Sequence, residues 1–143
     1  MEYFSSLFNL TPWALLALRV VLGAIFIAHG KAKLVAGPAG MAGLLKGQGF
    51  PMPTLFAWVV ALLEFVGGIL LVIGLFINPV SILLMIMILT ATYMKIVSWK
   101  KGLVDGYELD LLILAALLVL LAQGNMGIWA LDGVFFSDIA LDY

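Results

Sequence analysis

Residues 13–34 read W-A-L-L-A-L-R-V-V-L-G-A-I-F-I-A-H-G-K-A-K-L, an apolar run interrupted by one arginine and closed by a histidine and two lysines. The whole chain shares this character, since 65% of its 143 residues are hydrophobic, 10% are charged and the mean hydropathy is +1.23. Soluble domains are about half apolar and about one quarter charged. A soluble fold of this size could not bury so much apolar surface, so the sequence predicts an integral membrane protein.

Glycine, proline and asparagine residues interrupt the apolar sequence and divide the chain into four long apolar segments. A bilayer core about 30 Å thick requires about 20 helical residues, and a chain that crosses lipid must satisfy its backbone groups internally. We therefore predict an all-α fold, a four-helix membrane bundle that forms one domain over residues 1–143. The predicted spans are 11–29, 54–76, 79–97 and 105–123.

The connections suggest two further elements and an orientation. Glycines are frequent in the first connection, which contains a candidate short helix at residues 41–50, and Trp129, Phe135 and Phe136 suit an interfacial C-terminal segment. All six lysines lie in or beside the first and third connections: Lys31, Lys33, Lys46, Lys95, Lys100 and Lys101. By the positive-inside rule, these two connections are cytoplasmic and both termini lie outside.

Ionisable residues inside the predicted spans are the main functional signal. Arg19 and Glu64 lie well within the first and second spans, where an unpaired charge costs several kcal/mol. We expect them to face the bundle interior and to pair with each other, either as a packing lock between two helices or as the lining of a polar pocket. Glu108 and Asp110 open the fourth span; for Asp110 we favour an interfacial charge at a helix N-terminus.

The composition excludes several classes of site. The chain has no cysteine and one histidine, so thiolate metal sites, disulfides and thiol-redox chemistry are excluded, and no metal or flavin site is evident. His29 is interpreted either as an interfacial residue or as a proton-handling group. The net charge of −1 provides no basic field for nucleic acid.

Taken together, these motifs resemble the DoxX family. The matching pieces, in chain order, are an arginine and His-Gly-x-x-Lys on the first span, Gly-x-Pro-x-Pro, Glu-x-x-Gly-Gly on the second span, Tyr-Glu-Leu before the last span and a final Ala-Leu-Asp. The resemblance implies a four-helix membrane protein of prokaryotes. It also implies polar site residues at Arg19, His29, Lys33, Glu64 and Glu108. The basic Ser-Trp-Lys-Lys before Gly102 departs from the family pattern and leaves the role of residues 95–101 open.

The resemblance implies redox-associated roles, because relatives include a subunit associated with thiosulfate:quinone oxidoreductase and proteins of oxidative-stress defence. Our leading hypothesis is a membrane protein that binds quinone, or a similar lipophilic ring, inside the bundle as the subunit or partner of an oxidoreductase. Whether the chain is itself an enzyme stays open. The alternatives are a structural or assembly subunit without a ligand, and a small transporter. The expected partners are the lipid bilayer and either another protein or a second copy of the chain.

Overall fold

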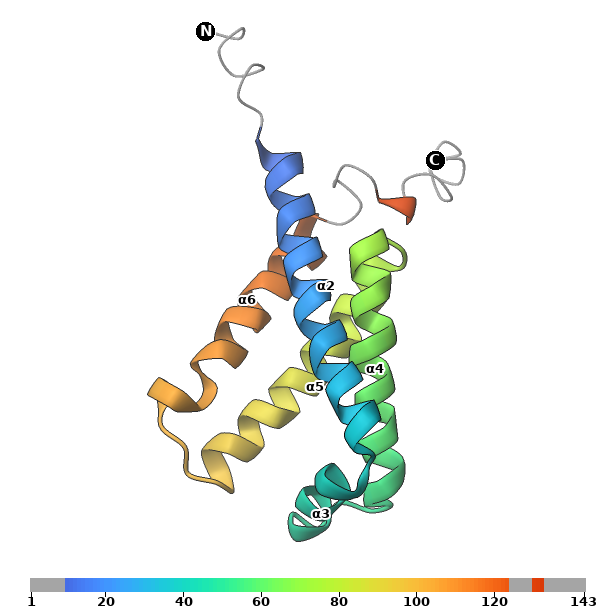
Figure 1. The fold of residues 1–143 in the computed structure, drawn as a ribbon. Coiled ribbons are helices and arrows are strands. Elements are labelled where there is room, and N and C mark those ends of the chain that lie inside the picture. Colours follow the sequence, from blue (N-terminus) through green and yellow to red (C-terminus); the bar gives the residue numbers. More distant parts are fainter. Residues whose placement is uncertain (1–9, 124–129, 133–143) are drawn as a thin grey trace, which may run out of the picture.

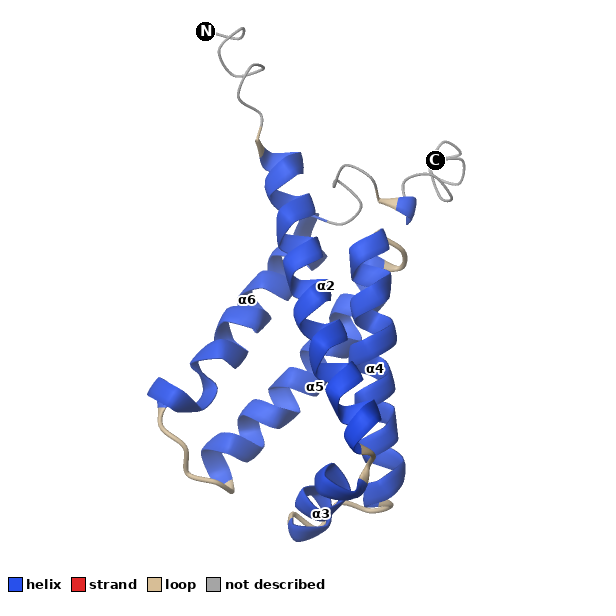
Figure 2. Cartoon of the chain, viewed as in Figure 1, coloured by secondary structure: helices blue, strands red, loops and turns tan. Residues whose placement is uncertain are grey.

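The computed structural model describes residues 10–123 and 130–132. Over these residues the chain forms five α-helices and one π-helical turn, without a β-strand (Figures 1 and 2). The elements are α2 (Thr11–Ala36), α3 (Ala39–Gly47), α4 (Pro53–Ile73), α5 (Ile77–Val97), η1 (Leu103–Tyr107) and α6 (Glu108–Gln123). The all-helical prediction is therefore confirmed, and Trp129, Phe135 and Phe136 of the expected interfacial segment lie outside the described residues.

Three helices, α2, α4 and α5, are long and apolar enough to cross a membrane. Helix α2 continues to Ala36 instead of ending at His29, so the histidine lies within a helix rather than at its end. The break between α4 and α5 falls at Gly74 and Phe76, which both adopt left-handed backbone conformations, and not at Asn78-Pro79. Pro79 fits inside the first turn of α5 because amides there need no intrahelical acceptor.

The fourth span expected at 105–123 corresponds to the π-helical turn followed by α6, which has 16 residues. A helix of that length is about 24 Å long, short of the roughly 30 Å hydrocarbon core. A fourth membrane crossing therefore stays a prediction.

The long helices are arranged as two antiparallel pairs. Helix α2 packs along α4, and α5 packs along α6, while α4 and α5 join the pairs (Figure 1). One apolar core draws on all four helices and includes Leu22, Leu71, Leu84 and Leu117. The glycine-rich connection is largely helical, because it forms α3, whose Leu45 packs with Ala57 and Met94 in a second cluster. Helix α3 and the α5–α6 connection lie at the same end of the molecule (Figure 1).

Glycine allows α2 and α4 to approach at backbone distance. A Cβ atom added at Gly68 would lie 2.7 Å from the carbonyl oxygen of Gly23, and one added at Gly30 would lie 2.7 Å from the Cα of Phe65. Both are closer than real Cβ atoms come, so any larger residue would push the helices apart. These contacts fix how far α2 is shifted along α4, and they therefore determine which polar side chains meet.

Candidate functional site

The central polar contact of the α2–α4 pair is an ion pair between Lys33 and Glu64. Lys33 Nζ donates a hydrogen bond to Glu64 Oε1 at 2.5 Å. The Glu64 side chain is 7% exposed and that of Lys33 is 29% exposed, so the lysine is the member that an approaching molecule meets first. Glu64 Oε2 is buried and accepts no hydrogen bond from any described residue.

The helices bring these two residues together for a local reason. Gly30 lies against the backbone of Phe65, and Lys33 is one helical turn further along the same face of α2. Its long side chain therefore reaches Glu64, which precedes Phe65 on α4. Glu64 lies about 9 Å along the helix axis from Trp58, an exposed aromatic residue near the α3 end. Glu64 therefore lies near the middle of α4.

The expected pairing of Arg19 with Glu64 is wrong. Arg19 is buried, at 1% exposure, but its guanidinium packs at the other end of α4, where a Cβ atom on Gly74 would lie 2.7 Å from Arg19 Nη1. The reason is the antiparallel packing of Gly23 against Gly68, which sets Arg19 beside the residues that follow Gly68 rather than those that precede it.

Asp132 is the acidic residue that acts on Arg19, and it was not among the predicted site residues. The two side chains attract each other electrostatically. Asp132, 4% exposed, also accepts hydrogen bonds from the backbone amides of Phe76 at 2.7 Å and Ile77 at 2.9 Å, which have no acceptor within helix α5 because they lie at its start. Asp132 is the last residue of the final Ala-Leu-Asp motif. A buried arginine requires an acidic partner, and this requirement could have identified Asp132 from the sequence.

A second ion pair joins α5 to α6. Lys95 Nζ donates to Asp110 Oδ1 at 2.8 Å, and the hydroxyl of Thr92 lies 3.2 Å from Asp110 Oδ2. Asp110 lies in the first turn of α6, as expected for an acid at a helix N-terminus, and is only 6% exposed because it packs against α5. Glu108, which we expected in the site, is exposed and only accepts a hydrogen bond from the amide of Asp105 at 3.3 Å. Two residues correspond to about 200° around a helix, so the two acids point in nearly opposite directions.

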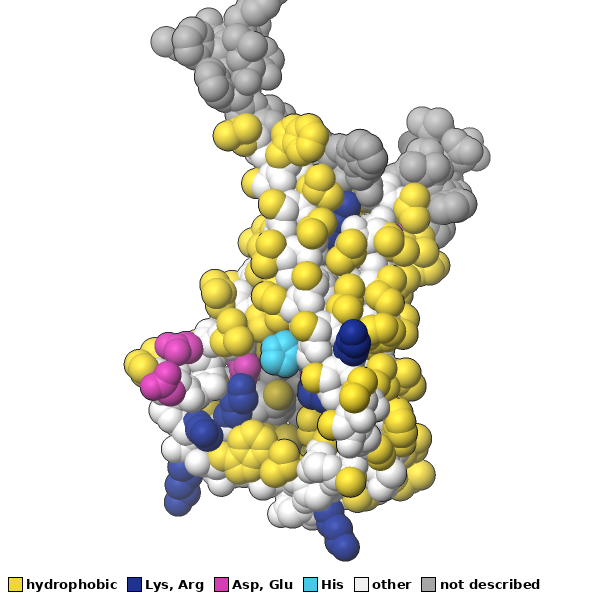
Figure 3. All heavy atoms as spheres, in the orientation of Figure 1, with side chains coloured by type: hydrophobic (Ala, Val, Ile, Leu, Met, Phe, Trp, Pro, Cys, Tyr) yellow, Lys and Arg dark blue, Asp and Glu magenta, His cyan; other side chains and the backbone are white. Residues whose placement is uncertain are grey.

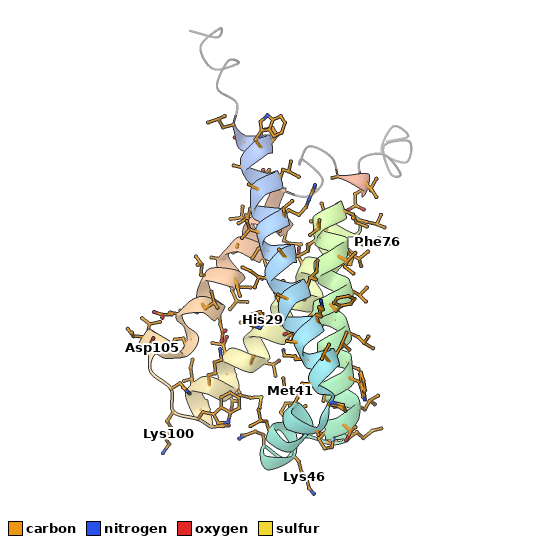
Figure 4. The ribbon with its side chains drawn as sticks, viewed as in Figure 1. His29, Met41, Lys46, Phe76, Lys100 and Asp105 are labelled. Carbon is orange, nitrogen blue, oxygen red and sulfur yellow. The ribbon has the colours of Figure 1, made fainter. Side chains whose placement is uncertain are left out.

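His29 is exposed and forms no hydrogen bond or ion pair within the described part of the chain. It projects from α2 on the side that faces α5 and α6 (Figure 4). The space-filling view shows it on the same face as acidic and basic side chains, in the half of the molecule that contains α3 (Figure 3). Residues 10–123 and 130–132 contain no group of three or more His, Cys, Asp or Glu residues that could hold a metal ion.

Of the five expected site residues, the structure brings together Lys33 and Glu64. Arg19 belongs to a separate cluster with Asp132, Glu108 lies on the surface, and His29 has no described polar partner. The polar groups therefore form three separate pairs rather than one shared internal space.

Comparison with known proteins gives one family match and two relatives. The DoxX family model matches residues 14–97. A protein of Haemophilus influenzae, described as uncharacterized, is 35% identical over 88% of this chain and 93% of its own length. The Bacillus subtilis protein named "Putative oxidoreductase CatD" is 32% identical over 85% of this chain and 87% of its own. No solved structure matches at the same level of significance.

Proposed function

Because this chain belongs to the DoxX family of membrane proteins, we propose that it binds a quinone, a quinol or a similar lipophilic ring at the Lys33–Glu64 pair, as the partner or subunit of an oxidoreductase. The observation that carries the proposal is a buried carboxylate inside an apolar helix pair, joined to a lysine that is partly exposed. Ionisable residues within membrane spans are rare and mark ligand, ion or proton pathways.

The two side chains offer complementary hydrogen-bonding groups. The ammonium of Lys33 has three N–H donors, and one of them binds Glu64, which leaves donors for a quinone oxygen. Glu64 Oε2 is an acceptor without a described donor, which a quinol hydroxyl would supply. Because Oε2 is enclosed, the ligand oxygen meets Lys33 first and reaches the carboxylate as the lysine side chain shifts.

The redox part of the proposal is supported by the name of the Bacillus subtilis relative, which includes the word oxidoreductase. In this proposal Lys33 and Glu64 bind and orient the ring and exchange its protons. The electrons pass to or from a partner protein. The purification that supplies protein for the binding test also shows what the partner is. A different protein or further copies of this chain would be recovered together with it.

Glu64→Gln is expected to weaken quinol binding. Decylubiquinol and decylubiquinone would be titrated against the purified protein in lipid nanodiscs. A hydrogen bond to a charged group contributes about 1.5–3 kcal/mol, so the dissociation constant of the quinol should rise about 10- to 100-fold. Glu108→Gln makes the same chemical change on an exposed side chain and should bind as the original protein does. Absence of saturable binding to the original protein, or equal binding by Glu64→Gln, would refute the proposal.

A structural or assembly role is the second candidate, and a specific observation favours it. Each charged contact joins two different segments: α2 with α4 through Lys33, α5 with α6 through Lys95, and α2 with the 130–132 segment through Arg19. Contacts of this kind also hold helices in register without any ligand. The paired substitutions described in the Discussion separate the two functions.

We further propose that the α3 end faces the cytoplasm, with both termini outside. The support is the concentration of lysine at that end. The chain contains no cysteine, so Gly43→Cys on α3, where added atoms meet nothing within 4 Å, gives a single labelling site. A membrane-impermeant maleimide should react with it in inverted vesicles but not in intact cells. Labelling in intact cells would reverse the orientation.

A further inference from the structure

The exposed basic residues are gathered at one end of the molecule. Within the described residues, the exposed lysines are Lys31, Lys46, Lys100 and Lys101, which we call the basic end. They come from α2, α3 and the α5–α6 connection, and they lie with two exposed carboxylates, Asp105 and Glu108. At the opposite end, the described charged residues Arg19 and Asp132 are both buried.

None of these four lysines is within ion-pair distance of an acidic group in residues 10–123 or 130–132, where the recorded ion pairs are Lys33–Glu64 and Lys95–Asp110. The basic end therefore carries positive charge that the described fold does not neutralise. Lys46 and Lys100 lie on different elements and point away from the helices (Figure 4). Side chains spread in this way suit many separate anions arranged over a surface better than one bound ion.

The connection that carries Lys100 and Lys101 is held in a defined conformation. The amide of Trp99 donates to Met94 O at 3.0 Å, and the amide of Lys101 donates to Lys95 O at 2.9 Å. Lys100 itself adopts a left-handed conformation with φ 49°, which turns the chain at the end of α5. The two ammonium groups are thus presented from a fixed turn.

The depth of the basic end is indicated by tryptophan. Trp58 and Trp99 are 40% and 39% exposed, and both are near this end of the molecule. Exposed tryptophans settle at the level of the lipid headgroups. The neighbouring lysines, whose flexible stems extend toward water, therefore reach the phosphate layer.

We propose that the basic end binds the phosphate groups of anionic phospholipids, with Lys100 and Lys101 as its fixed anchor. This assigns a role to the basic Ser-Trp-Lys-Lys stretch that the quinol site leaves unexplained. The interaction is independent of Lys33 and Glu64, so either proposal can fail without the other.

The test compares lipids that differ only in charge. Binding of phosphatidylglycerol and phosphatidylcholine to the detergent-solubilised protein would be measured by native mass spectrometry. Each lysine near an anionic surface contributes about a fivefold gain in affinity, so Lys100→Gln with Lys101→Gln should weaken phosphatidylglycerol binding about 25-fold. Phosphatidylcholine binding should not change.

Three controls make the result decisive. Lys100→Arg with Lys101→Arg keeps both charges and should retain the preference for phosphatidylglycerol. The unmodified protein should unfold at a higher temperature in nanodiscs containing phosphatidylglycerol than in nanodiscs of phosphatidylcholine alone. This difference should disappear in 1 M salt, where the Debye length is about 3 Å. Inorganic phosphate at 10 mM should not displace the lipid; displacement would identify a free-phosphate site instead. Equal binding of both lipids by the unmodified protein, or an unchanged preference in the glutamine variant, would overturn the proposal.

Discussion

Replacing Asp132 with alanine is expected to destabilise the folded protein by about 3–5 kcal/mol, the usual cost of removing one partner from a buried charge pair. Arg19, at 1% exposure, would lose its attracting carboxylate, and the amides of Phe76 and Ile77 would lose their acceptors. The expected observation is a large fall in the midpoint of thermal unfolding of the purified protein in detergent.

A matched control is available for this experiment. Asp105→Asn removes an exposed negative charge and keeps a residue type that tolerates the left-handed backbone at this position, φ 57°, so it should alter stability by no more than about 0.5 kcal/mol. If Asp132→Ala unfolded at the same temperature as Asp105→Asn, the 130–132 segment would not hold Arg19 in the folded protein.

The second large effect concerns the Lys33–Glu64 pair. Lys33→Leu alone leaves a carboxylate that is 7% exposed without its ammonium, and we expect a loss of about 3–5 kcal/mol. Lys33→Leu combined with Glu64→Leu removes both charges and should be more stable than Lys33→Leu alone by about 2 kcal/mol, within the range of coupling energies between contacting residues. Thermal unfolding of the single and double variants measures this coupling.

The same variants distinguish the two proposed functions. If the pair binds a ligand, the stable double variant should fold and still fail to bind decylubiquinol. If the pair only holds the helices in register, the double variant should keep every activity that the unmodified protein has. A double variant less stable than Lys33→Leu would show that the two side chains do not depend on each other.

The class of fold could be predicted from the sequence because lipid imposes strong constraints on composition and backbone. The positions of α4 and α5, and a short helix in the first connection, follow from apolar runs and their interruptions. The first predicted span ends at residue 29, where the apolar run gives way to Lys31 and Lys33. Polar residues end a membrane span without ending the helix, which here continues to Ala36.

The candidate site was predictable in part. Arg19 and Glu64 are buried, as the cost of an unpaired charge in lipid predicts. Helical periodicity gives the direction of a side chain around the axis but not the shift of one helix along another, and that shift decides whether Glu64 meets Arg19 or Lys33. The shift depends on the backbone contacts of Gly23 and Gly30 with α4, which sequence spacing alone does not determine.

The sequence contains a pattern that distinguishes Asp110 from Glu108 as the buried acid of α6. Asp110, Ile113, Leu117 and Leu120 recur at three- and four-residue steps, and all four are buried on α6. Glu108 is outside that stripe. Both acids are in the first helical turn, where either is stabilised by the helix dipole, so residue type by itself could not separate them.

The length of α6 has a consequence for the surrounding lipid. If this helix of about 24 Å crosses the membrane, the hydrocarbon next to it must become several ångströms thinner or leave the helix ends in a polar layer. Each ångström of mismatch costs a fraction of a kcal/mol, so the protein would concentrate in thin bilayer regions. Such local thinning would draw water and headgroups toward the ion pair between Lys95 of α5 and Asp110 of α6. The pair would then be hydrated, whereas in a thicker bilayer it would meet acyl chains.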